Sequence, residues 1–149
     1  MAVDFVAFDN GAQTVSYNPG SMSVVANCSQ QTLNTYTAFF CTAVMTNLSP
    51  STRYNYSISG ASGQTSQFSY FNGPYDRPEV FAIYADFGLG NDESISYLYK
   101  AFDEGAFDYI IHAGDWAYDL DSANSETGNG FMNSIQHYAA NVPYMGSPG

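Results

Sequence analysis

Two apolar runs in the second half of the chain form the clearest pattern of hydrophobic and polar positions. Residues 80–85 carry no charge and lie between a proline and two glycines, and residues 107–113 are also mostly apolar. Between them, from Glu93 to Glu104, apolar residues repeat at helical spacing. The pattern predicts a strand, a helix and a second strand, and such a crossover makes the two strands parallel. We therefore predict an α/β unit here.

The rest of this half is more polar. Residues 122–130 form a polar stretch rich in small residues, which predicts a loop. Residues 131–140 place Met132, Ile135 and Tyr138 near one face, which predicts a second helix.

The first half of the chain has the short, alternating apolar positions that are typical of β-strands. Residues 22–28 and 36–44 are predicted to form a hairpin with a polar turn near Asn34 and Thr35, and residues 67–71 are the last predicted strand. Two prolines and a glycine then mark a linker. The predicted organisation is a β domain at 1–73, a linker at 74–78 and an α/β domain at 79–149.

An acidic residue follows each of the two predicted parallel strands. Asp86 follows the first strand and Asp115 follows the second, with Tyr118 three residues further on. Open α/β sheets place their ligands at the carboxyl ends of their strands, so the two carboxylates are expected to share one site. Carboxylates suit hard cations, and a phenol joins them only if an ion such as trivalent iron lowers its pKa of about 10. All three side chains are candidate metal ligands.

The turns Asp86-Phe87-Gly88 and Gly114-Asp115-Trp116-Ala117-Tyr118 resemble the first motifs of purple acid phosphatases, a branch of the calcineurin-like metallophosphoesterases. Most of that superfamily has histidine where Gly88 stands, and a tyrosine at the position of Tyr118 marks the purple branch. The resemblance implies that Asp86 and Tyr118 bind Fe(III), and that Asp115 bridges it to a divalent zinc, manganese or iron ion. It implies an acid phosphatase that hydrolyses phosphate monoesters with a metal-bound hydroxide. No catalytic residue beyond these metal ligands is expected in the chain.

The resemblance extends to both ends of the chain. Gly149 matches the first residue of the family's third metal motif, so the remaining ligands are expected downstream, and the 149 residues are expected to be an inactive N-terminal part of the enzyme. Residues 48–56 resemble a turn and strand of a fibronectin type III-like domain, in which Tyr54 suits the tyrosine-corner role. The expected fold class is mixed β and α/β, with an incomplete fibronectin type III-like sandwich before the first part of an αββα metallophosphoesterase domain.

Acidic residues greatly outnumber basic ones. The chain has 14 Asp and Glu residues, three Lys and Arg residues, and a formal net charge of −11. Nucleic acid is excluded as a partner, because its binding depends on basic side chains that neutralise phosphates. A phosphorylated small molecule or protein is the expected substrate, with bound cations supplying the local attraction. No run is long and apolar enough to span a membrane, and the resemblance leaves open a homodimer of the intact enzyme.

The cysteines and asparagines of the first half bear on localisation. Cys28 and Cys41 lie in the predicted hairpin, where a cross-strand disulfide and two buried free thiols are both compatible with the sequence. Asn27, Asn47 and Asn55 each begin an Asn-x-Ser triplet, the acceptor pattern for glycosylation. Their clustering favours the secretory route, and thus a secreted or vacuolar/lysosomal protein.

Two other functions remain open. One is a phosphoesterase of the same fold that acts on diesters, nucleotides or pyrophosphate, and the other is a non-catalytic binding module that retains part of a phosphatase site. Two residues near the turns have simpler roles. His112 is interpreted as structural, because strand alternation directs it away from at least one neighbour of the site, and Trp116 is interpreted as a packing residue.

Overall fold

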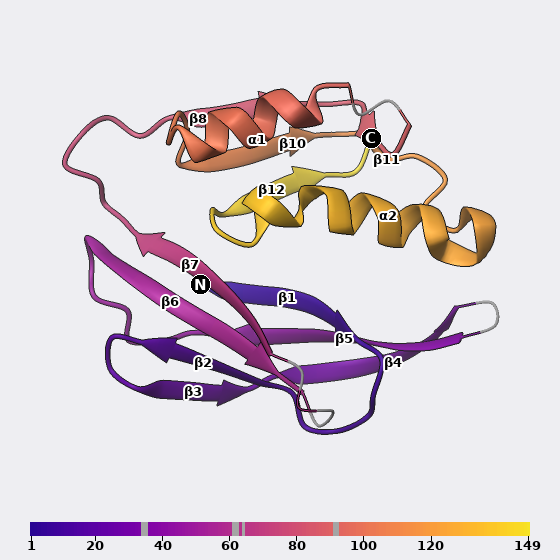
Figure 1. Cartoon of the computed structure of the whole chain (residues 1–149), viewed down its shortest axis with the longest axis horizontal. Coiled ribbons are helices and arrows are strands. Elements are labelled where there is room, and N and C mark those ends of the chain that lie inside the picture. The colour runs from indigo at the N-terminus through magenta and orange to yellow at the C-terminus, as the bar shows by residue number, and fades with distance from the viewer. Residues whose placement is uncertain (34–35, 61–62, 64, 91–92) are drawn as a thin grey trace. The chain divides into compact units, whose positions relative to one another are not determined.

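Strand pairing and contacts separate the chain into two units, Met1–Pro74 and Tyr75–Gly149. The computed structural model describes residues 1–33, 36–60, 63, 65–90 and 93–149. The described part of the first unit consists of strands and loops, and the second unit combines strands with helices (Figure 1). This confirms the predicted mixed β and α/β fold class.

The first unit is a sandwich of two antiparallel sheets. In one sheet, β5 lies between β1 and β4; in the other, the order is β3-β2-β6-β7. Both sheets contribute to a single core, with Val3 and Ala43 from the first and Val15, Tyr17 and Tyr56 from the second. The strands are β1 (Ala2–Ala7), β2 (Thr14–Asn18), β3 (Met22–Val25), β4 (Asn27–Leu33), β5 (Tyr36–Val44), β6 (Thr52–Ser59) and β7 (Thr65–Asn72).

The predicted strand at 22–28 is in fact two strands in different sheets. β3 pairs with β2, whereas β4 pairs with β5, so the chain changes sheet at Ala26. The N–H of Ala26 donates to the carbonyl of Gln13 at 2.9 Å at this crossing. Cys28 and Cys41 face each other across β4 and β5 and form a disulfide. The turn predicted at Asn34 and Thr35 lies outside the described residues.

Tyr54 closes the turn that leads into β6. Its side chain is buried in the sandwich core, and its hydroxyl accepts a hydrogen bond of 2.9 Å from the N–H of Ser49. A buried tyrosine bonded to the main chain just upstream is the arrangement of a tyrosine corner. This confirms the role predicted for Tyr54, while the fibronectin type III likeness of the unit stays a prediction.

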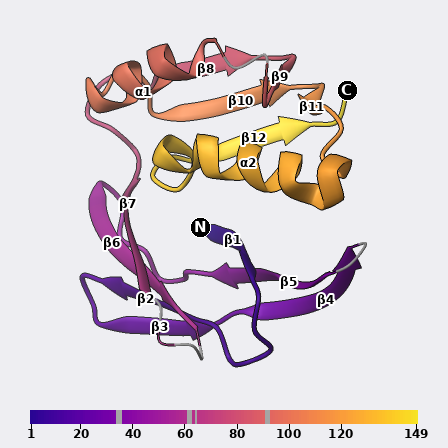
Figure 2. The same cartoon turned by 45° about the vertical axis from the view of Figure 1, so that its right-hand side comes forward.

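The second unit contains a parallel sheet in which β10 lies between β8 and β12 (Figures 1 and 2). A separate pair of two-residue strands, β9 and β11, is also parallel. A strand, a helix and a parallel strand therefore follow one another as predicted. The elements are β8 (Phe81–Tyr84), β9 (Phe87–Gly88), α1 (Ile95–Asp103), β10 (Tyr109–Ala113), β11 (Trp116–Ala117), α2 (Ser122–Ala139) and β12 (Tyr144–Ser147).

One face of the parallel sheet packs against both helices. Ile110 from β10 and Phe131, Ile135 and Tyr138 from α2 are fully or almost fully buried in this core, and α1 contributes partly buried residues. The opposite face exposes large apolar side chains, among them Phe81, Ile83 and Met145. The sheet therefore buries apolar side chains mainly on its helix-covered face.

The predicted loop at 122–130 is mostly helical. α2 begins at Ser122, and after three residues with positive φ, Ala123 to Ser125, it continues to Ala139. Its glycines allow close contacts, because a Cβ at Gly128 would lie 2.8 Å from the carbonyl oxygen of Leu120. Close packing therefore accounts for small residues that the sequence pattern assigned to a loop.

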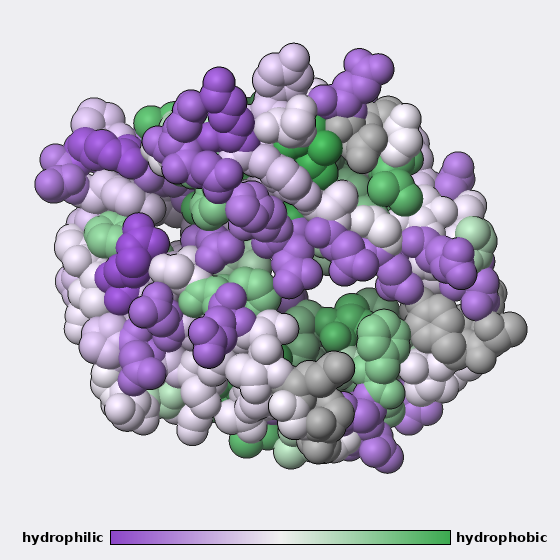
Figure 3. All heavy atoms as spheres, in the orientation of Figure 1, coloured by the Kyte–Doolittle hydropathy of each residue, from purple (hydrophilic) through white to green (hydrophobic). Residues whose placement is uncertain are grey.

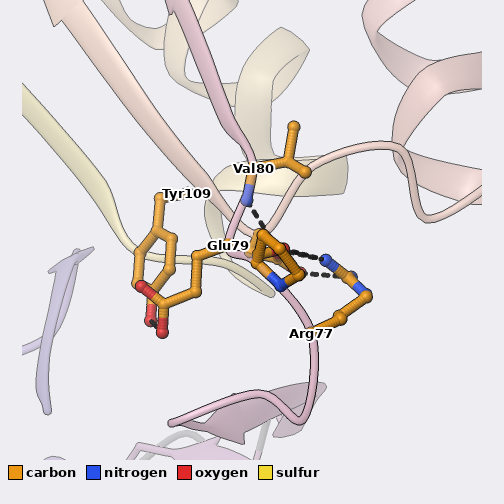
Figure 4. Close-up of polar contacts among 6 residues, drawn as sticks. Arg77, Glu79, Val80 and Tyr109 are labelled. Carbon is orange, nitrogen blue, oxygen red and sulfur yellow. Dashed lines mark hydrogen bonds and ion pairs between the residues drawn. The ribbon is translucent and has the colours of Figure 1, made fainter.

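An ion pair anchors the start of the second unit. Both terminal nitrogens of Arg77 lie 2.8 Å from the carboxylate of Asp108, and the N–H of Val80 donates to the same carboxylate at 2.9 Å. Figure 4 shows the side chain of Arg77 and the main chain of Val80 converging on this group, with the hydroxyl of Tyr109 near Glu79. The contacts tie the segment before β8 to the start of β10.

The face of the molecule seen in Figure 3 is largely hydrophilic. Hydrophilic and weakly polar residues cover most of the face in Figure 3, and hydrophobic residues form small groups on it. Within the described residues, none of the helices has the length and apolar character needed to cross a membrane.

Candidate metal centre

Three strand ends meet at one edge of the parallel sheet. Asp86 follows β8, Asp115 follows β10, and Gly149 follows β12. A Cβ built on Gly149 would collide with the carboxylate of Asp115, and the C-terminus lies beside β11 in both ribbon views (Figures 1 and 2). The parallel direction of the strands thus brings the three turns together.

The first two turns are also joined through the main chain. The N–H of Asp86 donates to the carbonyl of Gly114 at 3.4 Å. In the β9–β11 pair, Trp116 faces Phe87 and Ala117 faces Gly88. Main-chain contacts therefore hold the turn that carries Asp86 next to the turn that carries Asp115.

Tyr118 connects the two carboxylates. Its hydroxyl lies 3.0 Å from Oδ1 of Asp86 and 3.4 Å from Oδ2 of Asp115. The three residues predicted as metal ligands are thus brought together by the fold, and all three are exposed to solvent. The geometry places three oxygen atoms around one point that an ion can reach.

The backbone of these turns adopts unusual conformations. Asp86, Asp115 and Tyr118 have φ values of 52°, 43° and 32°, in the left-handed region that non-glycine residues rarely adopt. Such residues cost roughly 1–3 kcal/mol each and persist where the surrounding structure holds them, often at functional sites. Gly114, with φ of 94°, adopts a conformation that a residue without a Cβ accepts at little cost.

The surroundings of Tyr118 favour its protonated form. Partial burial raises its pKa, and the hydrogen bond to Asp86 and the charges of both carboxylates raise it further, to about 12. A phenolate therefore forms here only if a cation neutralises the two carboxylates.

The donor set fits a hard cation. Two carboxylates and a phenolate are oxygen ligands, and the single hydroxyl contacting both carboxylates shows that the three groups are close enough to share an ion. Across the described residues, no cluster of three or more His, Cys, Asp and Glu side chains is arranged for metal binding, so this set depends on Tyr118. The ligand roles of Asp86, Asp115 and Tyr118 stay predictions.

His112 and Trp116 lie beneath the turns rather than in the ligand set. His112 is fully buried, and its ring stacks on that of Trp116. Burial lowers the pKa of His112. The charge of Asp86 and a contact with the main chain of Asp115 act in the opposite direction but do not outweigh burial. The structural interpretation of both residues is confirmed.

Sequence reasoning missed the residues that support this ring pair. Tyr144 contacts His112 from β12, the hydroxyl of Tyr84 contacts Tyr144 from β8, and Gly146 leaves room for Trp116. Strand alternation could have indicated that Tyr84 and Tyr144 share a face. Their pairing depends on the register of β8, β10 and β12, which no local pattern specifies.

The fold is shared with a protein of known structure. The structure matches a purple acid phosphatase isolated from yellow lupin (Lupinus luteus) seeds with a TM-score of 0.78, over 99% of this chain and 32% of that one. Sequence identity in that match is 17%, so it shows the fold alone.

Sequence comparison identifies the relatives more closely. Acid phosphatase type 7 of Danio rerio is 38% identical over 108 residues, which are 71% of this chain and 24% of the relative. The Homo sapiens protein of the same name is 34% identical over 105 residues, 68% of this chain and 24% of the relative. No family model matches the chain. The chain belongs to the purple acid phosphatase family, and it spans about a quarter of the length of these relatives.

Proposed function

We propose that the chain is part of a metal-dependent acid phosphatase, which hydrolyses phosphate monoesters at a dinuclear centre of Fe(III) and divalent zinc, manganese or iron. The observation that carries the proposal is the contact of the Tyr118 hydroxyl with both Asp86 and Asp115. The contact lies at the strand ends of a fold shared with a purple acid phosphatase, in a chain related to acid phosphatases.

Each of the three residues has a distinct role in this proposal. Asp86 and Tyr118 would hold the ferric ion, and Asp115, which also contacts the Tyr118 hydroxyl, would serve both the ferric and the divalent ion. A bound pair of ions supplies Lewis acidity and an activated water for in-line attack at phosphorus. The negative charges of the three oxygen ligands lower the net charge of the ferric site.

The charge of the chain bears on its substrate. A net charge of −11 repels phosphorylated molecules at long range, so substrate attraction depends on the cations at the site. We infer a phosphorylated small molecule or protein as the substrate, and no nucleic acid partner. A homodimer of the intact enzyme is compatible with the proposal.

We also propose that the protein follows the secretory route to an extracellular or vacuolar/lysosomal location. The disulfide between Cys28 and Cys41 suits an oxidising compartment. Asn27, Asn47 and Asn55 are all exposed, as glycan attachment requires. Glycosidase treatment of the secreted protein, followed by mass spectrometry, tests the three sites, and unmodified asparagines would contradict the proposal.

Tyr118→Phe tests the metal centre. In the intact enzyme, the change should abolish the visible charge-transfer band between tyrosinate and Fe(III), because the phenolate that produces it is lost. Tyr97→Phe is the matched control, since Tyr97 is 76% exposed on α1 and should leave the band in place. A band that survives in Tyr118→Phe would remove Tyr118 from the metal.

The 149-residue chain alone should show no measurable phosphatase turnover. Three oxygen ligands from two turns are too few to hold two ions in the manner of a dinuclear site. Hydrolysis of a phosphate monoester by the purified chain, measured with added Fe(III) and zinc, would contradict this expectation. The Asp115→Asn variant is the control for contaminating phosphatase.

A further inference from the structure

His112 ties all three strands of the parallel sheet together beneath the candidate metal centre. It lies in β10 opposite Tyr84 of β8 and Gly146 of β12. Its Nδ1 is 2.8 Å from the hydroxyl of Tyr144, which accepts a hydrogen bond of 3.1 Å from the hydroxyl of Tyr84. The imidazole is thus fixed by one polar contact chain that crosses the sheet.

The indole of Trp116 lies on this fixed imidazole. The two ring centroids are 4.9 Å apart with an interplanar angle of 12°, and the ring of Tyr144 meets the indole edge-on at 5.2 Å. A Cβ added to Gly146 would lie 2.0 Å from Cζ2 of Trp116, so that side of the indole is also closely packed. Trp116 Nε1 has no hydrogen-bond partner among the described residues. Packing therefore holds the indole in place.

The position of Trp116 in the chain makes this packing relevant to the site. Trp116 lies between Asp115 and Tyr118, both of which have positive φ, and it pairs with Phe87, the residue after Asp86. Left-handed conformations of non-glycine residues persist only where their surroundings hold them. Fixing Trp116 is a direct way to hold the turn that carries Asp115 and Tyr118.

We propose that His112 is a positioning residue, which holds Trp116 and through it the arrangement of Asp115 and Tyr118 that binds metal. The identity of the ligand in this inference rests on the proposed function, whereas the positioning itself does not. A histidine that only filled space would stabilise the whole unit without a selective effect on the two turns.

Amide hydrogen exchange in the metal-free chain tests the positioning. His112→Ala should raise exchange at residues 86–88 and 114–118 about tenfold relative to the core amides of β10, because local opening becomes easier. Ile135→Ala, at an equally buried site on α2, should change exchange throughout the unit without this selectivity. Equal effects of the two variants on the turns would overturn the proposal.

Two further variants keep the test decisive if His112→Ala fails to fold. His112→Phe keeps a ring that can stack but loses the contact with Tyr144, so exchange at the turns should rise less than in the alanine variant. Gly146→Ala should raise exchange at the same turns by displacing Trp116 from the other side. Unchanged turns in both folded variants would also overturn the proposal.

Metal binding provides the second readout. Fe(III), supplied as its nitrilotriacetate complex, can be followed through the fluorescence of Trp116, the single tryptophan of the chain. His112→Ala should bind about tenfold more weakly than Ile135→Ala, as expected when support for metal ligands is lost. Equal affinities would contradict the proposal. If the wild-type chain binds no better than Asp115→Asn, the proposed function fails for this chain, and hydrogen exchange alone decides the role of His112.

Discussion

Asp108 shows how a single buried carboxylate determines a pH dependence. Its burial raises its pKa, but hydrogen bonds from Arg77 and Val80 and the charge of Arg77 outweigh that effect and leave the pKa below its ordinary value. A group with a lowered folded-state pKa stabilises the fold fully above its unfolded pKa of about 3.9. That contribution is lost as pH falls through the folded-state pKa.

We predict that Asp108→Asn lowers the free energy of unfolding by about 2 kcal/mol at neutral pH, because hydrogen bonds to a charged group are lost. The effect stays below that of a fully buried ion pair, since the Arg77 side chain is 45% exposed. Urea denaturation followed by Trp116 fluorescence measures it. The difference from wild type should shrink as acid protonates Asp108.

Glu104→Gln is the control for this measurement. Lys100 of α1 and Glu104, the residue just after this helix, form an ion pair of 3.8 Å, and both side chains are mostly exposed. Exposed pairs of this kind contribute little, so the control should unfold close to wild type at every pH. A change in Asp108→Asn no larger than in the control would show that Asp108 does not anchor the unit.

At the level of residues, the local sequence pattern was enough to predict that Asp86 and Asp115 lie at the same edge of the sheet. Each follows a short apolar run, and a helical crossover sends both runs in the same direction, so their ends meet at one edge. The contact between Tyr144 and His112 was not predictable in this way. It depends on the register of β12 against β10, which is set by packing across the sheet.

The disulfide is the feature of the first unit with the clearest energetic consequence for its strands. Cys28 and Cys41 are 13 residues apart and lie opposite each other in β4 and β5. Closing a loop of this size in the unfolded chain stabilises the folded state by about 3 kcal/mol in the chain-entropy account. The double variant Cys28→Ser, Cys41→Ser should lose about this much free energy of unfolding.

Urea denaturation followed by far-ultraviolet circular dichroism measures the loss. Wild-type chain treated with a reductant should unfold like the double variant, and the reductant should leave the variant unchanged. Gln30→Ala, an exposed change two residues after Cys28 on β4, is the control and should keep the wild-type midpoint. Equal stability of the oxidised and reduced chains would contradict the prediction.

The elements that were predicted incorrectly share a physical cause. Residues 22–28 are mostly apolar and read as one strand, but the chain crosses between sheets at Ala26, where the sequence pattern does not reveal the change of partner. The segment 122–130 carries two glycines that normally disfavour a helix. Packing against Leu120 and Leu89 requires small residues at these positions, so tertiary contacts decide the conformation.

At the level of the whole molecule, the uncovered face of the parallel sheet affects behaviour in solution. Phe81, Ile83 and Met145 are 45%, 66% and 45% exposed on strands β8 and β12. Exposed apolar surface promotes association, against the repulsion that a net charge of −11 provides. The 149-residue chain should therefore associate with itself more strongly at high salt, which screens that repulsion.

Ile83→Glu should weaken this self-association several-fold in sedimentation-velocity experiments, because it places a charge on the exposed face. Val25→Glu is the matched control, since Val25 is equally exposed, at 66%, on β3 of the first unit. An equal effect of both changes would attribute the result to net charge alone. A chain that stays monomeric at high salt would contradict the prediction.

The short pair of β9 and β11 has a consequence for how the family can vary. Pairing of Trp116 with Phe87 and of Ala117 with Gly88 is a main-chain interaction, which does not require particular side chains. Side chains beside the two acidic turns that do not pack against His112 or Trp116 can therefore change during evolution without breaking this pairing. Relatives that share only about a third of their residues with this chain can then retain the same spacing between the carboxylates.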